Sequence, residues 1–239
     1  MKHRRLTRAM DPGLYIAASG MLAEQVQQNQ LSNDLANSST PGYKSEQGQQ
    51  ESFGSLLLAN TSTGQAIGTI QTGVTINKVV TDTDPAPLTS TGQPLDFGIA
   101  GDGYFAVRTT GGVRYTRDGQ FSSDDKSQLV DANGDLVLGQ NGAPVAVSAT
   151  GTVSATALGV FNVNNVQQQG NTLLSGTAAG RGTGVVRQGE LEGSGVDPVQ
   201  TMTDMIASLR AYQAGQSALQ SIDQTMQEDA ESVPSLGGP

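Results

Sequence analysis

Two segments at opposite ends of the chain repeat on a period of 3.5 residues, and this period limits the fold more than any other feature. The N-terminal seam alternates steps of four and three residues through Leu14, Ala18, Met21, Gln25, Gln28, Ser32 and Leu35. The C-terminal seam alternates steps of three and four through Met202, Met205, Leu209, Tyr212, Gln216, Leu219, Asp223 and Met226. Such a period keeps one stripe against a neighbour only if the helices wrap left-handed. We therefore predict terminal helices that pair as a coiled coil, with an ordinary bundle hairpin as the alternative because each run covers only about three to four heptads.

Both segments open on the same helix-start signal. Asp11 precedes Pro12 and Asp197 precedes Pro198, and proline is well tolerated at the first helical position because its missing N–H has no partner there. The N-terminal helix is too weakly apolar to be stable alone in water. We therefore expect it to need a partner.

The stretch NDLANSSTPGYK ends the first helix abruptly and forms an elbow. Asn37 can take a left-handed C-cap, Pro41 forbids continuation and pushes Thr40 into an extended conformation, and Gly42 permits a reversal. Tyr43 then offers a ring and a hydroxyl that can hold the redirected chain against the helix. The elbow residues are Asn37, Thr40, Pro41, Gly42 and Tyr43.

Between the helices the period changes from 3.5 to 2, as in LDFGI (residues 95–99) and YFAVR (residues 104–108). Alternation of this kind predicts strands. Turn pairs such as Asp118-Gly119 and Asn133-Gly134 separate them and favour tight hairpins. We predict an α+β fold in which N- and C-terminal helices pair as a coiled-coil domain around a central, mainly antiparallel β domain. The predicted parts are a helical domain of residues 10–44 plus 190–231, a β domain of residues 73–166, and extended connectors at 45–72 and 167–189.

Composition and charge exclude several classes of protein. The formal net charge of −9 argues against a phosphate-backbone partner, so no nucleic acid is expected. Cysteine is absent and the only histidine is His3, which removes disulfides, thiolate sites and histidine-based catalysis or zinc binding. No apolar run approaches the length of a membrane span. Residues 1–9, with Lys2, Arg4, Arg5 and Arg8, are interpreted as a basic extension, either placed upstream of a start at Met10 or a genuine basic arm.

Three motifs that resemble chemical sites are better explained as turns. GIAGDG (residues 98–103) is followed by a strand and not by a helix that could receive a phosphate. DANGD (residues 131–135) has the wrong glycine position for a calcium loop. Asp124 and Asp125 are adjacent, so on a strand they would face opposite sides. We therefore predict no catalytic, cofactor-binding or metal-binding residues.

Several segments resemble the signatures of bacterial flagellar axial proteins, the rod and hook components. Ser19-Gly20-Met21 and LSNDLANSSTPGYK resemble the N-terminal signature. QPLDFGIAGDGYFAV, YTRDGQFSSDD and LVDANGDLVLG resemble the middle-domain signatures, and VRQGELEGSGVDPVQTMTDMIASLRAY resembles the C-terminal helix. The resemblance extends from Met10 to about Met226. Asp34 stands where Asn is usual and Gly195 replaces an Asn, and the short middle domain favours a rod protein over the larger hook protein.

The resemblance implies a structural subunit of the flagellar basal-body rod, with no cofactor. Such a subunit would leave the cytoplasm through the flagellar type III export apparatus and polymerise in the basal body, within the cell envelope, with copies of itself and other rod or hook proteins into a hollow, torque-transmitting shaft. The residues expected to carry packing within and between subunits are Leu14, Ala18, Met21, Leu35, Met202, Met205, Leu209, Tyr212 and Leu219.

Two other classes of function remain as alternatives. A secreted adhesin or carbohydrate-binding β module on a helical stalk would need an exposed aromatic platform on the β domain. An enzyme would need a cleft with convergent ionisable groups. The enzyme is the less favoured of the two because cysteine and a core histidine are missing.

Overall fold

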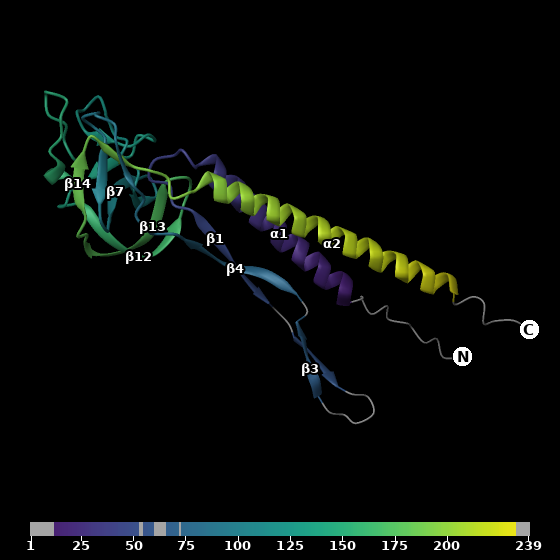
Figure 1. Cartoon of the computed structure of the whole chain (residues 1–239). Coiled ribbons are helices and arrows are strands. Elements are labelled where there is room, and N and C mark those ends of the chain that lie inside the picture. The colour runs from purple at the N-terminus through teal and green to yellow at the C-terminus, as the bar shows by residue number, and fades with distance from the viewer. Residues whose placement is uncertain (1–11, 53–54, 60–65, 72, 233–239) are drawn as a thin grey trace, which may run out of the picture. The chain divides into compact units, whose positions relative to one another are not determined.

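The computed structural model describes residues 12–52, 55–59, 66–71 and 73–232 (Figure 1). The predicted basic extension, residues 1–9, lies outside these ranges. The chain divides into two compact units, one of Met1–Ser32, Gly48–Val79 and Met202–Pro239 and the other of Asn33–Gln47 and Val80–Thr201. Within the described residues, helix α1 (Pro12–Ala36) and helix α2 (Pro198–Ser232) enclose all the strands in sequence. The expected α+β class with terminal helices is therefore confirmed.

In the first unit, α1 and α2 lie side by side and run antiparallel (Figure 1). The Ser208 hydroxyl donates to the Glu24 carbonyl at 3.2 Å. Further along α2, a Cβ added to Gly215 would lie 2.7 Å from Met21 Cγ. Because the contact moves toward the start of α1 as it moves toward the end of α2, the two helix axes point in opposite directions.

Both helices begin at the predicted prolines, Pro12 and Pro198. Asp197 caps α2, since its Oδ1 accepts from the backbone N–H groups of Val199 at 2.9 Å and Gln200 at 3.3 Å. Asp11, the corresponding residue before α1, lies outside the described ranges. The start signals in the sequence are therefore confirmed at both helices, and the cap itself at α2.

The segment expected to be the first connector, 45–72, contains paired strands. Strand β1 (Glu46–Ser52) pairs with β4 (Val74–Thr81), and β2 (Ser55–Ala59) pairs with β3 (Ala66–Gln71) in an antiparallel register that sets Leu56 opposite Ile70. Asn77 donates to Glu51 across the first ribbon at 2.7 Å. Backbone pairing orders this Gly-, Ser- and Gln-rich segment although its side-chain pattern is weak.

The second unit is built on a seven-stranded antiparallel sheet in the order β12-β13-β8-β7-β11-β10-β9. The strands are β7 (Tyr104–Thr109), β8 (Gly112–Thr116), β9 (Ser122–Ser123), β10 (Leu129–Val130), β11 (Leu136–Leu138), β12 (Val160–Gln168) and β13 (Leu173–Arg181). Strand β12 also pairs with β7, so β7, β8, β13 and β12 form a closed cycle of pairings. The predicted mainly antiparallel β domain is confirmed. The predicted hairpin at Asn133-Gly134 joins β10 to β11.

Two short ribbons complete this unit. Strand β6 (Phe97–Ala100) pairs with β14 (Val185–Gln188), and β5 (Leu88–Ser90) pairs with β15 (Glu190–Glu192). A 3₁₀ turn covers Ala155–Ala157. Strands β13 and β14 lie in the segment expected to be the second connector, 167–189. This segment is therefore also built of paired strands. The ribbon of β15 brings the residues just before α2 onto the β domain.

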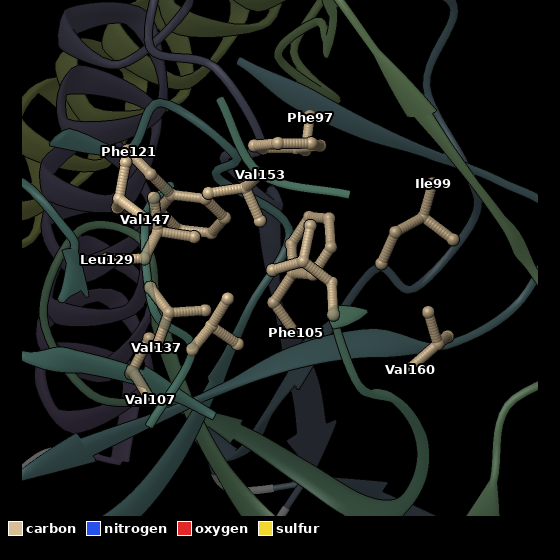
Figure 2. Close-up of a cluster of buried hydrophobic side chains, with 12 residues drawn as sticks. Phe97, Ile99, Phe105, Val107, Phe121, Leu129, Val137, Val147, Val153 and Val160 are labelled. Carbon is tan, nitrogen blue, oxygen red and sulfur yellow. The ribbon is translucent and has the colours of Figure 1, made fainter. Parts of the chain in front are cut away.

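The core of the second unit is apolar and contains most of the chain's phenylalanines (Figure 2). Phe105 meets Phe121 edge to face, with ring centroids 5.3 Å apart and planes at 77°, a favourable geometry for aromatic pairs. Phe97, Val107 and Val137 are fully buried beside them. This unit has a dry core of its own, and the elbow is attached to it.

Candidate functional site: the elbow and the helix faces

The elbow begins where Asn37 closes the C-terminus of α1. The Asn37 side-chain amide donates to the Asn33 carbonyl and to Asn33 Oδ1, both at 2.9 Å, and its Oδ1 accepts from the Thr40 hydroxyl at 3.3 Å. The expectation of a left-handed backbone at Asn37 is wrong, because the described non-glycine residues with positive φ are Ser127 and Asn165. Side-chain capping of the last carbonyls replaces the left-handed cap. The reversal is made at Gly42, whose φ is 65°.

Gly42 is pressed against the backbone of the β domain. A Cβ at this position would lie 2.2 Å from the Asp118 nitrogen and 2.3 Å from the Arg117 carbonyl carbon. The Gly42 N–H donates to the Glu192 carbonyl at 3.0 Å. Glycine is therefore required here both for its positive φ and for its lack of a side chain.

Tyr43 holds the turned chain against the end of α1, as the sequence predicts. Its ring is fully buried, and its hydroxyl donates to Asp34 Oδ1 at 2.8 Å. Burial raises the pKa of the Asp34 carboxyl, and the Tyr43 hydrogen bond opposes that shift. Burial also raises the pKa of the Tyr43 phenol, helped by the neighbouring Asp34. The hydroxyl therefore remains a donor at any physiological pH.

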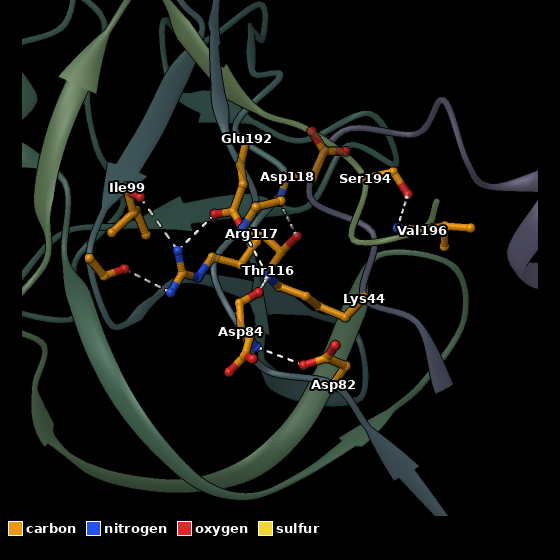
Figure 3. A network of polar contacts seen from close by, with 12 residues as sticks. Lys44, Asp82, Asp84, Ile99, Thr116, Arg117, Asp118, Glu192, Ser194 and Val196 are labelled. Atoms are coloured by element: carbon orange, nitrogen blue, oxygen red, sulfur yellow. Dashed lines mark hydrogen bonds and ion pairs between the residues drawn. The ribbon is translucent and has the colours of Figure 1, made fainter. Parts of the chain in front are cut away.

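Lys44, the next residue, enters a buried ion triad (Figure 3). Glu192 Oε1 is 2.7 Å from Lys44 Nζ, and Glu192 Oε2 is 2.7 Å from Arg117 Nη1. All three side chains are almost completely shielded from solvent. The triad joins the elbow after α1, the end of β8 and strand β15 before α2, three segments that are distant in sequence.

Backbone groups complete the triad. Arg117 donates to the Gly101 carbonyl at 2.9 Å and lies over the Tyr104 ring, 5.1 Å from its centroid. Lys44 donates to the Asp84 carbonyl at 2.5 Å. Among the described residues Arg117 Nε has no hydrogen-bond partner. A single carboxylate thus compensates two buried cations, and removal of one partner from such a group is costly.

Asp118 lies beside the elbow, in a hollow of about 710 Å³ that Thr40 and Pro41 also line. Its Oδ1 accepts from the Gln120 N–H at 2.9 Å. Burial raises the pKa of the Asp118 carboxyl to about 6, and Asp131 and Asp96 add to the shift. The folded chain therefore binds this proton more tightly than the unfolded chain does.

The Asp118 carboxyl should contribute to the pH dependence of stability. Because the folded-state pKa is raised, the contribution is complete below the ordinary pKa of 3.8 and is lost as pH rises through about 6. Asp118→Asn keeps the acceptor oxygen and should stabilise the chain by about 1–3 kcal/mol at pH 7.5 but not at pH 4. Urea unfolding at the two pH values measures this. Asp125→Asn on an exposed turn is the matched control, and an unchanged pH slope in Asp118→Asn would contradict the assignment.

The two helices bury small or polar side chains and expose large apolar ones. Ala23 and Ser208 are 5% and 4% exposed, whereas Leu22 and Ile206 are 62% and 54% exposed. This is the reverse of the usual distribution in a surface helix, where the apolar stripe faces inward. Within the described ranges, the outer faces of α1 and α2 therefore carry exposed apolar side chains.

The structure divides the predicted packing residues between two faces. Those that are half-buried are Leu14, Ala18, Met21, Leu35, Met205, Tyr212 and Leu219. Met202 and Leu209 are exposed, on the same side of α2 as Ile206. Sequence reasoning did not single out Ser208 and Gly215 on the inner side, or Lys44, Arg117 and Glu192 in the triad.

Other kinds of site find little support in the described part of the chain. The aromatic rings Phe97, Tyr104, Phe105, Tyr115 and Phe121 are buried, so the adhesin alternative lacks the exposed platform that it requires. No group of acidic or histidine side chains with metal-binding geometry occurs among the described residues. None of the helices in the described ranges is both long and apolar enough to cross a membrane.

Exposed apolar side chains on the terminal helices and a buried elbow are features expected of a structural, assembling protein. Comparison with known families agrees. Residues 187–232 match the model of the flagellar basal body rod FlgEFG protein C-terminal region, residues 98–155 match the flagellar hook protein FlgE/F/G D1 domain, and residues 14–44 match the flagella basal body rod protein model.

Whole-chain relatives give the same result. The chain is 31% identical over 255 residues to flagellar basal-body rod protein FlgF of Caulobacter vibrioides, with 95% of this chain and 99% of that protein covered. It is 31% identical over 247 residues to FlgF of Escherichia coli, with 90% and 95% covered. It is 29% identical over 266 residues to flagellar hook-basal body complex protein FlhO of Bacillus subtilis, with 92% and 98% covered. The chain belongs to the flagellar basal-body rod protein family. It is a structural subunit of the basal body and not an enzyme.

Proposed function

We propose that this rod subunit polymerises through α1 and α2 into a hollow shaft that transmits torque. The observation that carries the proposal is the reversed polarity of the helix pair, with Leu22, Val26, Met202, Ile206 and Leu209 all exposed. Apolar side chains are stabilised by about 25 cal/mol for each Å² removed from water. Neighbouring subunits that cover these residues would gain that free energy on assembly.

The 3.5-residue period supports a coiled-coil arrangement of the assembled helices. The inner contacts at Ser208 and Gly215 are small, so the two helices gain little apolar burial from each other. Isolated helices with few apolar contacts are marginal in water. Residues 10–44 and 190–231 would therefore form a helical domain that is completed by other copies and by other rod or hook proteins, while residues 73–166 form an outer layer.

The elbow gives the shaft its stiffness in this proposal. Asn37, Thr40, Pro41, Gly42 and Tyr43 redirect the chain after α1. The ion triad then attaches both the elbow and strand β15 to the β domain. Within the β unit, the elbow and β15 are thereby held by buried contacts.

Passage through the flagellar export apparatus is compatible with this composition. The chain has no cysteine, so no disulfide has to be opened for it to travel extended. Marginal helices that order on assembly would also lower the cost of unfolding before export. The proposed function therefore includes export by this route before assembly.

The test compares helix content before and after assembly. Circular dichroism of the dilute chain should show low helicity, and the assembled chain should show more because packing orders the helices. Concentration-dependent sedimentation identifies the assembled state. Equal helicity in both states would remove the basis for assembly-coupled ordering.

A further inference from the structure

Two carboxyls lie against the elbow without a cation beside them. Asp34, in the last turn of α1, is 4% exposed and accepts from the Tyr43 hydroxyl at 2.8 Å. Asp118, which follows β8, lines a hollow of about 710 Å³ together with Thr40 and Pro41. Among the described residues neither carboxyl takes part in an ion pair. The elbow therefore covers two acidic groups whose charge no salt bridge balances in that part of the chain.

The cations nearest to these carboxyls in sequence are bound elsewhere. Lys44 follows Tyr43, and Arg117 precedes Asp118. Both cationic side chains bind the Glu192 carboxylate, each at 2.7 Å (Figure 3). The ion triad thus uses the positive charges that the elbow and the end of β8 bring to this region.

The surroundings of Asp34 disfavour a negative charge. Burial raises the pKa of its carboxyl, and the carboxylate of Glu46, at the start of β1, adds to the rise. Hydrogen bonds from the Tyr43 hydroxyl and from the Glu46 backbone oppose the rise without cancelling it. The end of a helix is also unfavourable for an anion, because the helix dipole is negative there. Folding therefore favours the neutral form of Asp34.

The surroundings of Asp118 act in the same direction. Burial raises the pKa of its carboxyl to about 6, and the charges of Asp131 and Asp96 add to the rise. Asp135 and Arg114, whose charges are opposite, line the same hollow. Ionisation of Asp118 therefore adds a negative charge to a region where other carboxylates already repel it.

We infer that the elbow is a proton-dependent latch, which protonation of Asp34 and Asp118 holds closed and which their ionisation loosens. The buried Tyr43 covers the first carboxyl, and Thr40 and Pro41 border the second. A buried carboxylate regains water when the residues that cover it move away, so ionisation favours an elbow that is lifted from its contacts.

The latch should be firm in acid and weaker at neutral pH. Because the folded-state pKa of each carboxyl is raised, its stabilising contribution is complete below the ordinary value of 3.8. The contribution is lost as pH rises through the raised pKa values. In a rod subunit, the joint after α1 would then be held more firmly in an acid medium. The inference goes beyond the proposed function and does not depend on it, because one free chain carries every group involved.

Hydrogen exchange of the free chain at pH 4.5 and pH 7.5 tests the latch, with each rate corrected for intrinsic exchange at that pH. The reporters are the Gly42 N–H, which donates to the Glu192 carbonyl, and the Tyr43 N–H, which donates to the Thr40 carbonyl. Their protection should fall about tenfold as pH rises, since one unit of pKa shift is a tenfold change in an equilibrium.

The double variant Asp34→Asn with Asp118→Asn should lose most of this fall, because Asn keeps an acceptor oxygen without the charge. Asp125→Asn with Asp223→Asn is the matched control, since it removes two carboxylates from exposed positions and should keep the fall. Amides of the β core around Phe105 should change less than those of the elbow, which distinguishes local opening from unfolding of the whole unit.

Three results would overturn the inference. They are equal corrected protection of the elbow at both pH values, a fall of the same size in the β core, and a fall that persists in the double variant of Asp34 and Asp118. Each leaves the proposed function standing, because none of them involves assembly. Failure of the original chain to enter rods would overturn the proposed function and leave the latch untouched.

Discussion

Glu192→Gln is expected to destabilise the β unit by about 3–5 kcal/mol, because it removes the carboxylate charge that pairs with two buried cations. Gln keeps the size of the side chain and one acceptor oxygen, so the loss reports charge and not a cavity. Lys44 and Arg117 would remain buried in an environment built for a carboxylate. Against a typical total stability of about 5–15 kcal/mol this is a large fraction. Urea or thermal unfolding of the whole chain, followed by near-ultraviolet tyrosine signals, measures it.

The control for this prediction lies two residues away. Glu190→Gln removes the same charge from the start of β15, where Glu190 is 3.8 Å from the exposed side chain of Arg187. An exposed pair of this kind contributes at most about 1 kcal/mol. If Glu192→Gln were as mild as Glu190→Gln, the triad would not be what attaches the elbow and β15 to the core.

Gly42→Ala is expected to be comparably severe and to act at the elbow itself. A non-glycine residue at a φ of 65° costs about 1–2 kcal/mol. The new methyl group would in addition meet the Asp118 nitrogen at 2.2 Å, and backbone cannot yield as a flexible side chain does. A total loss of roughly 3 kcal/mol or more is expected in unfolding experiments.

Gly92→Ala separates the two contributions. Gly92 has a φ of 69°, nearly that of Gly42, but no atom lies within 4 Å of its would-be Cβ. It should therefore show the conformational cost alone. Equal losses for the two variants would mean that the elbow is free to move away from the β domain.

Local signals in the sequence predicted the boundaries of the elements well. Pro12 and Pro198 mark the helix starts because proline suits only the first turn. Pro41 and Gly42 mark the elbow for equally local reasons. Asn37 was predicted in the wrong conformation, since its side chain can cap the helix in two ways and the sequence does not distinguish them.

The ion triad could not be predicted in the same way. Lys44 and Glu192 are 148 residues apart, and neither stands in a pattern that points to the other. Their pairing results from the β15 ribbon and the elbow meeting on one surface. A charged residue directly after the elbow, Lys44, was the one local signal available.

The 3.5-residue period identified apolar positions on the helices but not the neighbour that each one faces. Met205 and Tyr212 are half-buried, whereas Met202 and Leu209 are exposed. When the half-buried and the exposed apolar positions lie on adjacent sides of one helix, the sequence shows them as a single broad apolar stripe. Only the arrangement of α1 and α2 separates the inner face from the outer one.

Backbone hydrogen exchange, residue by residue, in the free subunit and in assembled rods tests the central claim most directly. We predict that amides along α1 and α2 exchange at least tenfold more slowly after assembly, while those of the β core around Phe105 and Val137 change little. Helices that are equally protected in the solitary chain and in the rod would contradict the claim that other copies complete them.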